Sequence, residues 1–145
     1  MSVRIAIING PNLNLVGTRE PEIYGNRTFD EILDDLRKDF SEITLEYYQS
    51  NHEGQLIDWL HMLGFLVDGI VLNPGGYSHT SIALRDAVAA VTSPVVEVHI
   101  SDIKAREPFR HHSYLEDVCA TSIIGRGVQG YAEAIQFLLG EQDRD

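Results

Sequence analysis

The sequence is poor in cysteine and in basic residues. Its single cysteine, Cys119, cannot form an internal disulfide, and its position in an apolar run indicates a buried thiol rather than a nucleophile. Eleven lysines and arginines stand against 22 acidic residues, so the formal net charge is -11. This balance argues against binding to nucleic acid or to an anionic membrane surface, because both require basic patches. A small anionic substrate is still allowed, since it needs only a few local cations or helix N-termini.

Long apolar runs and targeting features are also missing. The apolar stretches are far shorter than the about 20 residues of a membrane-spanning helix, so we expect no membrane span. The first residues, MSVRIAIING, lack the basic start, long apolar middle and cleavage site of a signal peptide, which predicts a cytoplasmic location. There is no linker-like, repeated or low-complexity tract. A chain of 145 residues with 43% hydrophobic side chains therefore predicts one domain, residues 1–145.

Several motifs of catalysis and ligand binding are absent. The sequence has no GxxxxGK[ST] phosphate loop, no GxSxG nucleophile turn, no HExxH and no Cys/His spacing of a zinc site. Gly125, Gly127 and Gly130 fit GxGxxG literally, but they follow the last predicted strand and no second βαβ unit supplies an acidic ribose ligand. We therefore interpret these glycines as a tight turn between a strand and a helix.

Strand and helix patterns alternate along the whole chain. Short apolar runs predict five strands, at residues 3–9, 43–50, 67–73, 94–99 and 121–125. Helical spacing predicts helices at residues 28–40, 54–63, about 80–91 and 128–139, with a short helical turn at 113–117. Residues 10–27 are expected to form a long polar loop, and the tail 141–145 is expected to fray.

Helix boundaries can be predicted from capping residues. Thr28 and Glu31 have the spacing of a capping box at the start of the first helix. Gly64 is placed to end the second helix, and either Thr80 or Ser81 is placed to cap the third.

The alternating pattern predicts an α/β fold. Five apolar strands, each followed by a helix or helical turn, indicate a three-layer sandwich with a parallel sheet, for which the flavodoxin-like strand order 2-1-3-4-5 is the natural choice at this size. Ligands of such sheets bind beyond the carboxyl ends of the strands. The residues that follow each strand are therefore the candidates for a functional site.

Polar side chains follow three of the predicted strands. Strand one leads into NGPNLNLVGTREPEIYG, strand three into NPGGYSHTS, and strand four ends in EVHISD before two arginines. Solvated polar loops would explain one such cluster, but three at the same edge of a sheet favour a functional site. The candidate residues are Asn12, Arg19, Tyr24, Asn73, His79, Glu97, His99, Ile100, Ser101, Arg106 and Arg110.

Tyr24 and Arg19 are the most informative pair. A tyrosine is a poor base at neutral pH unless a cation beside its phenol favours the phenolate. The two residues lie five positions apart in a loop punctuated by Gly and Pro, so they can approach each other. Spacing alone favours a surface tyrosine next to a surface arginine.

His99 and Glu97 form a second candidate pair. Alternation along a strand places positions i and i+2 on the same face, so the carboxylate can orient the imidazole as a general acid. A core histidine satisfied by a neighbour is the alternative. The backbone amides at Ile100 and Ser101 could hold a carboxylate, and Arg106 and Arg110 could supply positive charge, although solvated arginines are common.

Six blocks of the sequence resemble the type II 3-dehydroquinate dehydratases, in order and at the expected separations. They are NGPNLNLVGTREPEIYG, QSNHEGQLIDWL, NPGGYSHTSIALRDAV, PVVEVHISD, REPFRHHSY and GRGVQGY. The resemblance implies a flavodoxin-like fold, a dodecamer built as a tetramer of trimers, and no metal or organic cofactor. It implies conversion of the anionic substrate 3-dehydroquinate to 3-dehydroshikimate, in the shikimate route to aromatic amino acids or in the quinate pathway.

The resemblance also implies roles for individual residues. Tyr24 matches the proton acceptor, Arg19 the residue that activates it, His99 the proton donor and Glu97 its partner. Asn12 matches the residue that positions a water at the enolate, and Asp86 matches an acidic residue supplied by a neighbouring subunit. Substrate contacts are implied for Asn73, His79, Ile100, Ser101 and Arg110, and a mobile cover role for Arg106.

Four positions depart from the usual pattern of that family. Val16, Gly76 and Ser78 are mild changes, whereas Asp102 adds a negative charge beside the expected carboxylate pocket. A non-catalytic flavodoxin-like module that binds a nucleotide or flavin is the competing hypothesis. Bound flavin colour would favour that module, and formation of an absorbing enone from 3-dehydroquinate would favour the enzyme.

Overall fold

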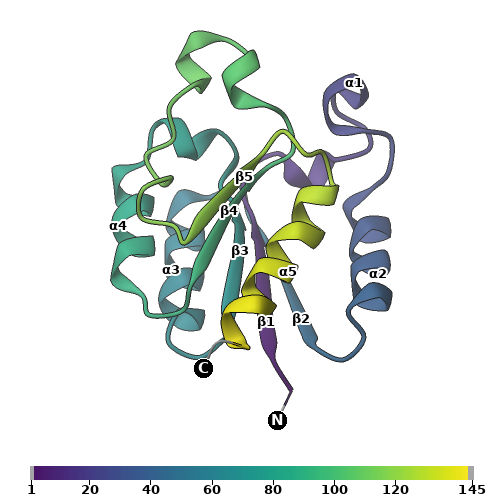
Figure 1. Cartoon of the computed structure of the whole chain (residues 1–145). Coiled ribbons are helices and arrows are strands. Elements are labelled where there is room, and N and C mark those ends of the chain that lie inside the picture. Colours follow the sequence, from purple (N-terminus) through teal and green to yellow (C-terminus); the bar gives the residue numbers. More distant parts are fainter. Residues whose placement is uncertain (1, 144–145) are drawn as a thin grey trace.

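A five-stranded parallel sheet forms the centre of the protein in a computed structural model, which describes residues 2–143 (Figure 1). The strands are β1 Arg4–Asn9, β2 Thr44–Gln49, β3 Gly69–Asn73, β4 Val95–His99 and β5 Thr121–Ile124. Their order is β2-β1-β3-β4-β5, which confirms the predicted flavodoxin-like topology. Asn9 is in register with both Gln49 and Asn73, so three neighbouring strands end at one level.

Two helices cover each face of the sheet (Figure 1). Helices α2 (Phe29–Asp39) and α5 (Gln129–Gln142) pack on one face, and α3 (Glu53–Leu63) and α4 (Ile82–Ala90) pack on the other. Strand β1 is apolar throughout its interior because its side chains alternate between the two cores: Ile5 and Ile7 contact the first, Ala6 and Ile8 the second. A strand covered on both faces explains the near-continuous apolar runs of the sequence.

The predicted helix caps are present. The Thr28 hydroxyl accepts a hydrogen bond from the Glu31 amide (3.3 Å), and the Glu31 carboxylate accepts one from the Thr28 amide (3.1 Å), which confirms the capping box of α2. Of the two candidates for α4, Ser81 is the cap, because its hydroxyl accepts from the Leu84 amide at 2.8 Å. Gly64 ends α3 as predicted.

The structure differs from the sequence prediction mainly outside the sheet. Residues 10–27 are not a simple loop, since they contain the 3-10 helix η1 (Leu13–Leu15) and the short helix α1 (Pro21–Tyr24). Three further 3-10 helices are η2 (Gly75–His79), η3 (Ile103–Ala105) and η4 (Pro108–Arg110). Near the helical turn predicted at 113–117, residues 114–118 form hydrogen-bonded turns, in which the Leu115 carbonyl accepts from the Val118 and Cys119 amides.

The C-terminal tail was predicted to fray from residue 141, and this was wrong for its first residues. Helix α5 continues to Gln142 and is capped by Asp143, because Leu138 and its neighbours still pack against the sheet near that end. Residues 144 and 145 lie outside the described part of the chain.

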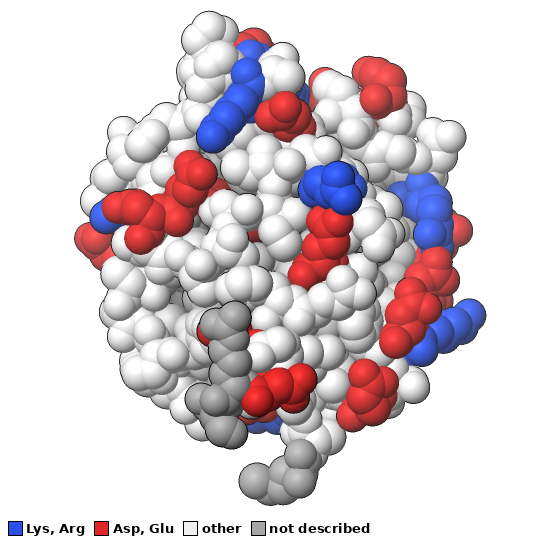
Figure 2. All heavy atoms as spheres, in the orientation of Figure 1, with Lys and Arg blue, Asp and Glu red and all other residues white. Residues whose placement is uncertain are grey.

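Acidic and basic side chains are interspersed on the face drawn in Figure 2, where the few Lys and Arg side chains lie among Asp and Glu. Within residues 2–143, no helix is both long enough and apolar enough to cross a bilayer.

The capping box leads to a stability prediction. Replacing Thr28 with Ala should lower the free energy of unfolding by about 1 kcal/mol, because the orphan amide at the start of α2 loses its acceptor. Urea denaturation of Thr28→Ala and of the matched control Thr28→Ser checks this. Equal stability of the alanine and serine variants would contradict it.

Candidate active site

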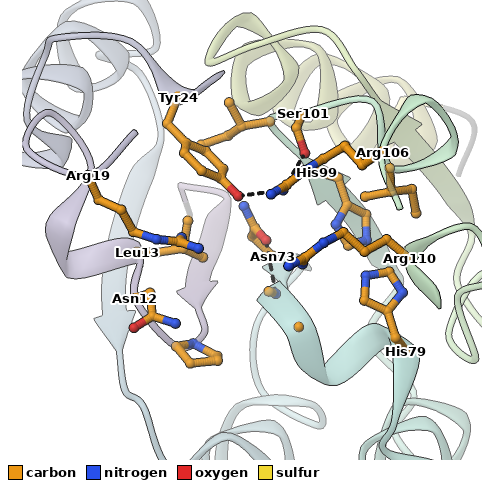
Figure 3. Close-up of a pocket in the computed structure, with 15 residues that line it drawn as sticks. Asn12, Leu13, Arg19, Tyr24, Asn73, His79, His99, Ser101, Arg106 and Arg110 are labelled. Carbon is orange, nitrogen blue, oxygen red and sulfur yellow. Dashed lines mark hydrogen bonds between the residues drawn. The ribbon is translucent and has the colours of Figure 1, made fainter. Parts of the chain in front are cut away.

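A cavity of about 270 Å³ lies at the carboxyl ends of β1, β3 and β4 (Figure 3). Segments far apart in the sequence meet there: the loop after β1, the η2 turn after β3, and the η3–η4 segment after β4. Ten of the residues singled out in the sequence line the cavity, namely Asn12, Arg19, Tyr24, Asn73, His79, His99, Ile100, Ser101, Arg106 and Arg110.

Tyr24 is held at the end of α1 with two guanidinium groups beside it. Pro21 begins this short helix and Gly25, with a φ of 87°, ends it. The Arg106 Nη1 donates a hydrogen bond to the Tyr24 oxygen at 2.8 Å, and the Arg19 Cζ lies 5.1 Å from the ring centroid. The phenol oxygen is thus bound by Arg106, whereas Arg19, the expected partner, lies over the ring and forms an ion pair with Glu20 (3.3 Å). Contact between Tyr24 and Arg106 joins residues 82 positions apart.

Glu97 and His99 form a buried pair on β4, as strand alternation predicts. The His99 Nε2 lies 2.6 Å from the Glu97 Oε2, and the two residues are 5% and 0% exposed. Two serine hydroxyls also donate to the carboxylate, Ser113 to Oε2 at 2.5 Å and Ser122 to Oε1 at 2.8 Å. Burial alone would raise the pKa of Glu97, but the hydrogen bond and charge of His99 and the two serine hydrogen bonds hold this pKa below its ordinary value.

His79 contributes a second imidazole to the cavity. Its Nδ1 lies 2.9 Å from the carbonyl oxygen of His112, which can only accept, so Nδ1 carries the proton. Burial lowers the pKa of His79, and the charges of His99 and Arg110 act in the same direction, outweighing the hydrogen bond to His112. A neutral ring with a proton on Nδ1 leaves Nε2 as a hydrogen-bond acceptor.

Two asparagines occupy the floor and one wall of the cavity. Asn73, the last residue of β3, accepts a hydrogen bond from the Gly75 amide at its Oδ1 (3.1 Å). Asn12 has a left-handed backbone with a φ of 70°, which asparagine tolerates better than most residues, and its backbone N–H donates to the Asn51 Oδ1 (3.0 Å). Their side chains extend toward the cavity in Figure 3.

The segment after β4 forms one side of the cavity. Asp102 caps η3, since its Oδ1 accepts from the Lys104 amide at 3.0 Å, and its side chain does not line the cavity. The extra charge anticipated at the carboxylate pocket is therefore directed into the turn. Arg110 donates to Glu107 at 2.8 Å, and the Arg106 Nη1 also lies 3.4 Å from the Ser101 hydroxyl.

Some placements differ from the sequence expectation or were not anticipated by it. Asp86 is exposed on α4 and does not line the cavity of its own chain, and its contribution to a different subunit stays a prediction. Leu13 and Ile103 line the cavity and were not singled out, because apolar residues in polar loops carry no chemical signal. Ser113 and Ser122 were also missed, since single serines are not diagnostic.

Together these groups can carry out acid–base chemistry on an anion. A phenol bound by a guanidinium and an imidazole bound by a carboxylate face one polar cavity, and three arginines supply positive charge. The fold and the site thus define an acid–base enzyme with a flavodoxin-like sheet. The chain belongs to a known family of this kind: residues 3–139 match the model of the family described as "Dehydroquinase class II".

Similar proteins agree with this assignment. The chain is 53% identical over 139 residues to a 3-dehydroquinate dehydratase of Anoxybacillus flavithermus, covering 94% of each chain. It is 49% identical over 139 residues to "Catabolic 3-dehydroquinase 2" of Neosartorya fischeri, covering 94% of this chain and 93% of the relative. The crystal structure of type II dehydroquinase from Butyrivibrio crossotus superposes with a TM-score of 0.91 at 46% identity, covering 95% of this chain and 98% of the other.

The environment of Glu97 leads to a pH prediction. Because its pKa is below the ordinary 4.5, the charged carboxylate stabilises the native state above that value, and this stability is lost as pH falls through the lowered pKa. Ser122→Ala removes one hydrogen bond and should lower the free energy of unfolding by about 1–2 kcal/mol at pH 7. The deficit should narrow as the pH falls below 4.5 and through the lowered pKa of Glu97, because the carboxyl then becomes protonated in both proteins.

Urea denaturation between pH 7 and pH 3 measures this effect. The matched control is Ser93→Ala, because the buried Ser93 hydroxyl donates to the Val67 carbonyl (2.6 Å), which does not titrate. A Ser122→Ala deficit as independent of pH as that of Ser93→Ala would show that the charge of Glu97 is not involved.

Proposed function

We propose that this chain is a 3-dehydroquinate dehydratase that removes water from 3-dehydroquinate by anti elimination through an enolate, within one catalytic domain of residues 1–145. The observation that carries the proposal is the pair of opposed groups in one cavity, Tyr24 with its guanidinium partner and His99 with its carboxylate. Membership of the dehydroquinase family indicates that the substrate is 3-dehydroquinate. Nothing in the family match or in the relatives supports a nucleotide- or flavin-binding module.

Tyr24 acts as the base in the first step. A guanidinium 2.8 Å from the phenol oxygen stabilises negative charge there, so the phenolate can remove a proton from the carbon beside the substrate ketone. The electrons of the C–H bond form an enolate, whose oxygen then needs preorganised donors. Asn12 lies on the cavity wall and positions a water at that oxygen, while Arg19 stabilises the charge that develops.

His99 acts as the acid in the second step. Collapse of the enolate expels the hydroxyl group, which takes a proton from His99 and leaves as water. Tyr24 gains one proton and His99 loses one, so the number of protons on the enzyme is unchanged over the cycle. Each turnover releases one water and one enone. Glu97 keeps the imidazole oriented because its carboxylate is itself fixed by Ser113 and Ser122.

The remaining cavity residues bind the substrate. Its carboxylate is an anion, and Arg110 with the backbone amides at Ile100 and Ser101 offers cationic and N–H donors for it. The His79 Nε2 accepts from a substrate hydroxyl, and Asn73 donates to one. Arg106 covers the cavity while it binds the Tyr24 oxygen. No metal ion or organic cofactor takes part in this scheme.

Assembly as a dodecamer, a tetramer of trimers, is also proposed. Exposure of Asp86 on α4, outside the cavity of its own chain, supports a role for this carboxylate in the site of a neighbouring subunit. A cytoplasmic location and the absence of nucleic-acid or membrane partners stay predictions from the sequence.

A spectrophotometric assay tests the function. Colourless purified protein should convert 3-dehydroquinate to a product with the absorption of a conjugated enone.

Tyr24→Phe, which lacks the ionisable oxygen, and His99→Ala should each lower kcat by at least about 100-fold, because removal of a general acid or base lowers the rate by a factor of roughly 10²–10⁴. Tyr24→Phe should unfold at urea concentrations close to those of wild type, whereas His99→Ala should unfold at lower ones because the buried Glu97 carboxylate loses a donor, so kcat is compared where both variants are shown to be folded. Retained turnover in either variant would remove that residue from its role, and a protein coloured by flavin and without turnover would reject the enzyme.

Mixed oligomers test the subunit arrangement. Light scattering should give a mass of about twelve chains of 16.2 kDa. Asp86→Ala and Tyr24→Phe should each be nearly inactive, yet oligomers reassembled from a mixture should regain activity, because some sites then combine an intact Tyr24 with a neighbour's intact Asp86. If oligomers shown to contain both variants regain no activity, Asp86 does not contribute to the site of its neighbour.

A further inference from the structure

A chain of buried hydrogen bonds lies directly behind the cavity. Tyr131, in the first turn of α5, is fully buried, and its hydroxyl lies between the last residues of β1 and β3. The Asn73 Nδ2 donates to the Tyr131 oxygen at 2.9 Å, and the Tyr131 hydroxyl donates to the Asn9 Oδ1 at 2.9 Å. Asn9 and Asn73 are in register on neighbouring strands, which brings both amides under the same tyrosine.

The groups at the ends of this series of hydrogen bonds determine which atom donates and which accepts in each bond. The Gly75 amide can only donate, so the Asn73 oxygen must face it and the Asn73 nitrogen must face Tyr131. The phenol oxygen accepts from Asn73 and uses its own proton for Asn9. Burial raises the pKa of Tyr131, so the hydroxyl keeps the proton that it donates. The Asn9 Nδ2 then lies 3.4 Å from the Tyr47 hydroxyl.

One donor of Asn73 is left for the cavity. A side-chain amide has two N–H groups and one oxygen, and here the oxygen and one N–H are bound within the protein. Asn73 is 3% exposed and lines the cavity, so its second N–H is the group available to a ligand oxygen. Neither Tyr131 nor Asn9 lines the cavity.

We infer that Tyr131 is a positioning residue for substrate binding: its hydroxyl fixes the Asn73 amide so that an N–H of Asn73 is presented to an oxygen of the substrate. This inference rests on the proposed function and adds a residue that does not touch the substrate. Within residues 2–143 no buried side-chain nitrogen or oxygen lacks a hydrogen-bond partner. Removing the Tyr131 hydroxyl would leave the Asn73 Nδ2 and the Asn9 Oδ1 without this partner, and the Asn73 side chain would then be oriented only by its hydrogen bond from the Gly75 amide.

A double-mutant cycle tests the inference. Tyr131→Phe should lower kcat/KM for 3-dehydroquinate about tenfold, the effect of losing one well-placed hydrogen bond, mainly through a higher KM with kcat changed less than about threefold. In an Asn73→Ala background the same substitution should change kcat/KM by less than about twofold, because the amide that Tyr131 positions is gone. Additive losses, or a loss in kcat alone, would overturn the inference.

Controls separate positioning from stability. Ser93→Ala also removes a buried hydrogen bond, to the Val67 carbonyl, and should destabilise the protein without changing KM. If Tyr131→Phe does not fold, Asn9→Leu serves instead. It leaves the Tyr131 hydroxyl without its acceptor and should raise KM only when Asn73 is present.

The two proposals can fail separately. A folded wild type without turnover overturns the proposed function and this inference with it. An active wild type in which Tyr131→Phe and Asn73→Ala act independently overturns this inference alone.

Discussion

A charged carboxylate buried in the protein interior is the constraint on which the site depends. Desolvation of Glu97 is unfavourable unless donors surround the carboxylate, and here three do, from β4, β5 and the segment that follows η4. Loss of any one donor therefore lowers the stability of the native state. The need of the buried Glu97 carboxylate for donors also fixes the imidazole of His99 at the cavity, because His99 is one of them.

Much of the fold could be predicted from the sequence because its signals are local. The apolar runs predicted all five strands to within a few residues, and Thr28 and Glu31 predicted the start of α2. The Glu97–His99 pair follows from strand alternation alone. These cases share one property, which is that the interacting residues are close in the chain and their spacing carries the information.

Contacts between distant segments could not be found in this way. Spacing pairs Tyr24 with Arg19, yet the phenol oxygen is bound by Arg106, which arrives from the other side of the cavity with η3. Ser122 lies in no motif, and the motifs that contain Ser113 and Tyr131 assign them no role, so only the packed sheet shows that they reach Glu97 or Asn73. The short helix α1 was missed because four residues give too weak a periodicity.

The overall charge of a protein and the charge of its site can have opposite signs. The chain has a formal net charge of -11, but Arg19, Arg106 and Arg110 all line the cavity, and no acidic residue among residues 2–143 does. Acidic groups elsewhere keep the surface well solvated. Recognition of an anion is thus a local property, set by three side chains at one edge of the sheet.

The two ends of the segment between His99 and Ser113 are bound to a single atom, the Glu97 Oε2. In Figure 1 this segment rises above the sheet as the two short turns η3 and η4. Because its ends are already closed, added or lost residues at its tip cost little loop-closure entropy and leave β4 and β5 undisturbed. Evolution can accordingly reshape the entrance to the cavity by insertion or deletion there, while the geometry of the Glu97–His99 pair below stays constant.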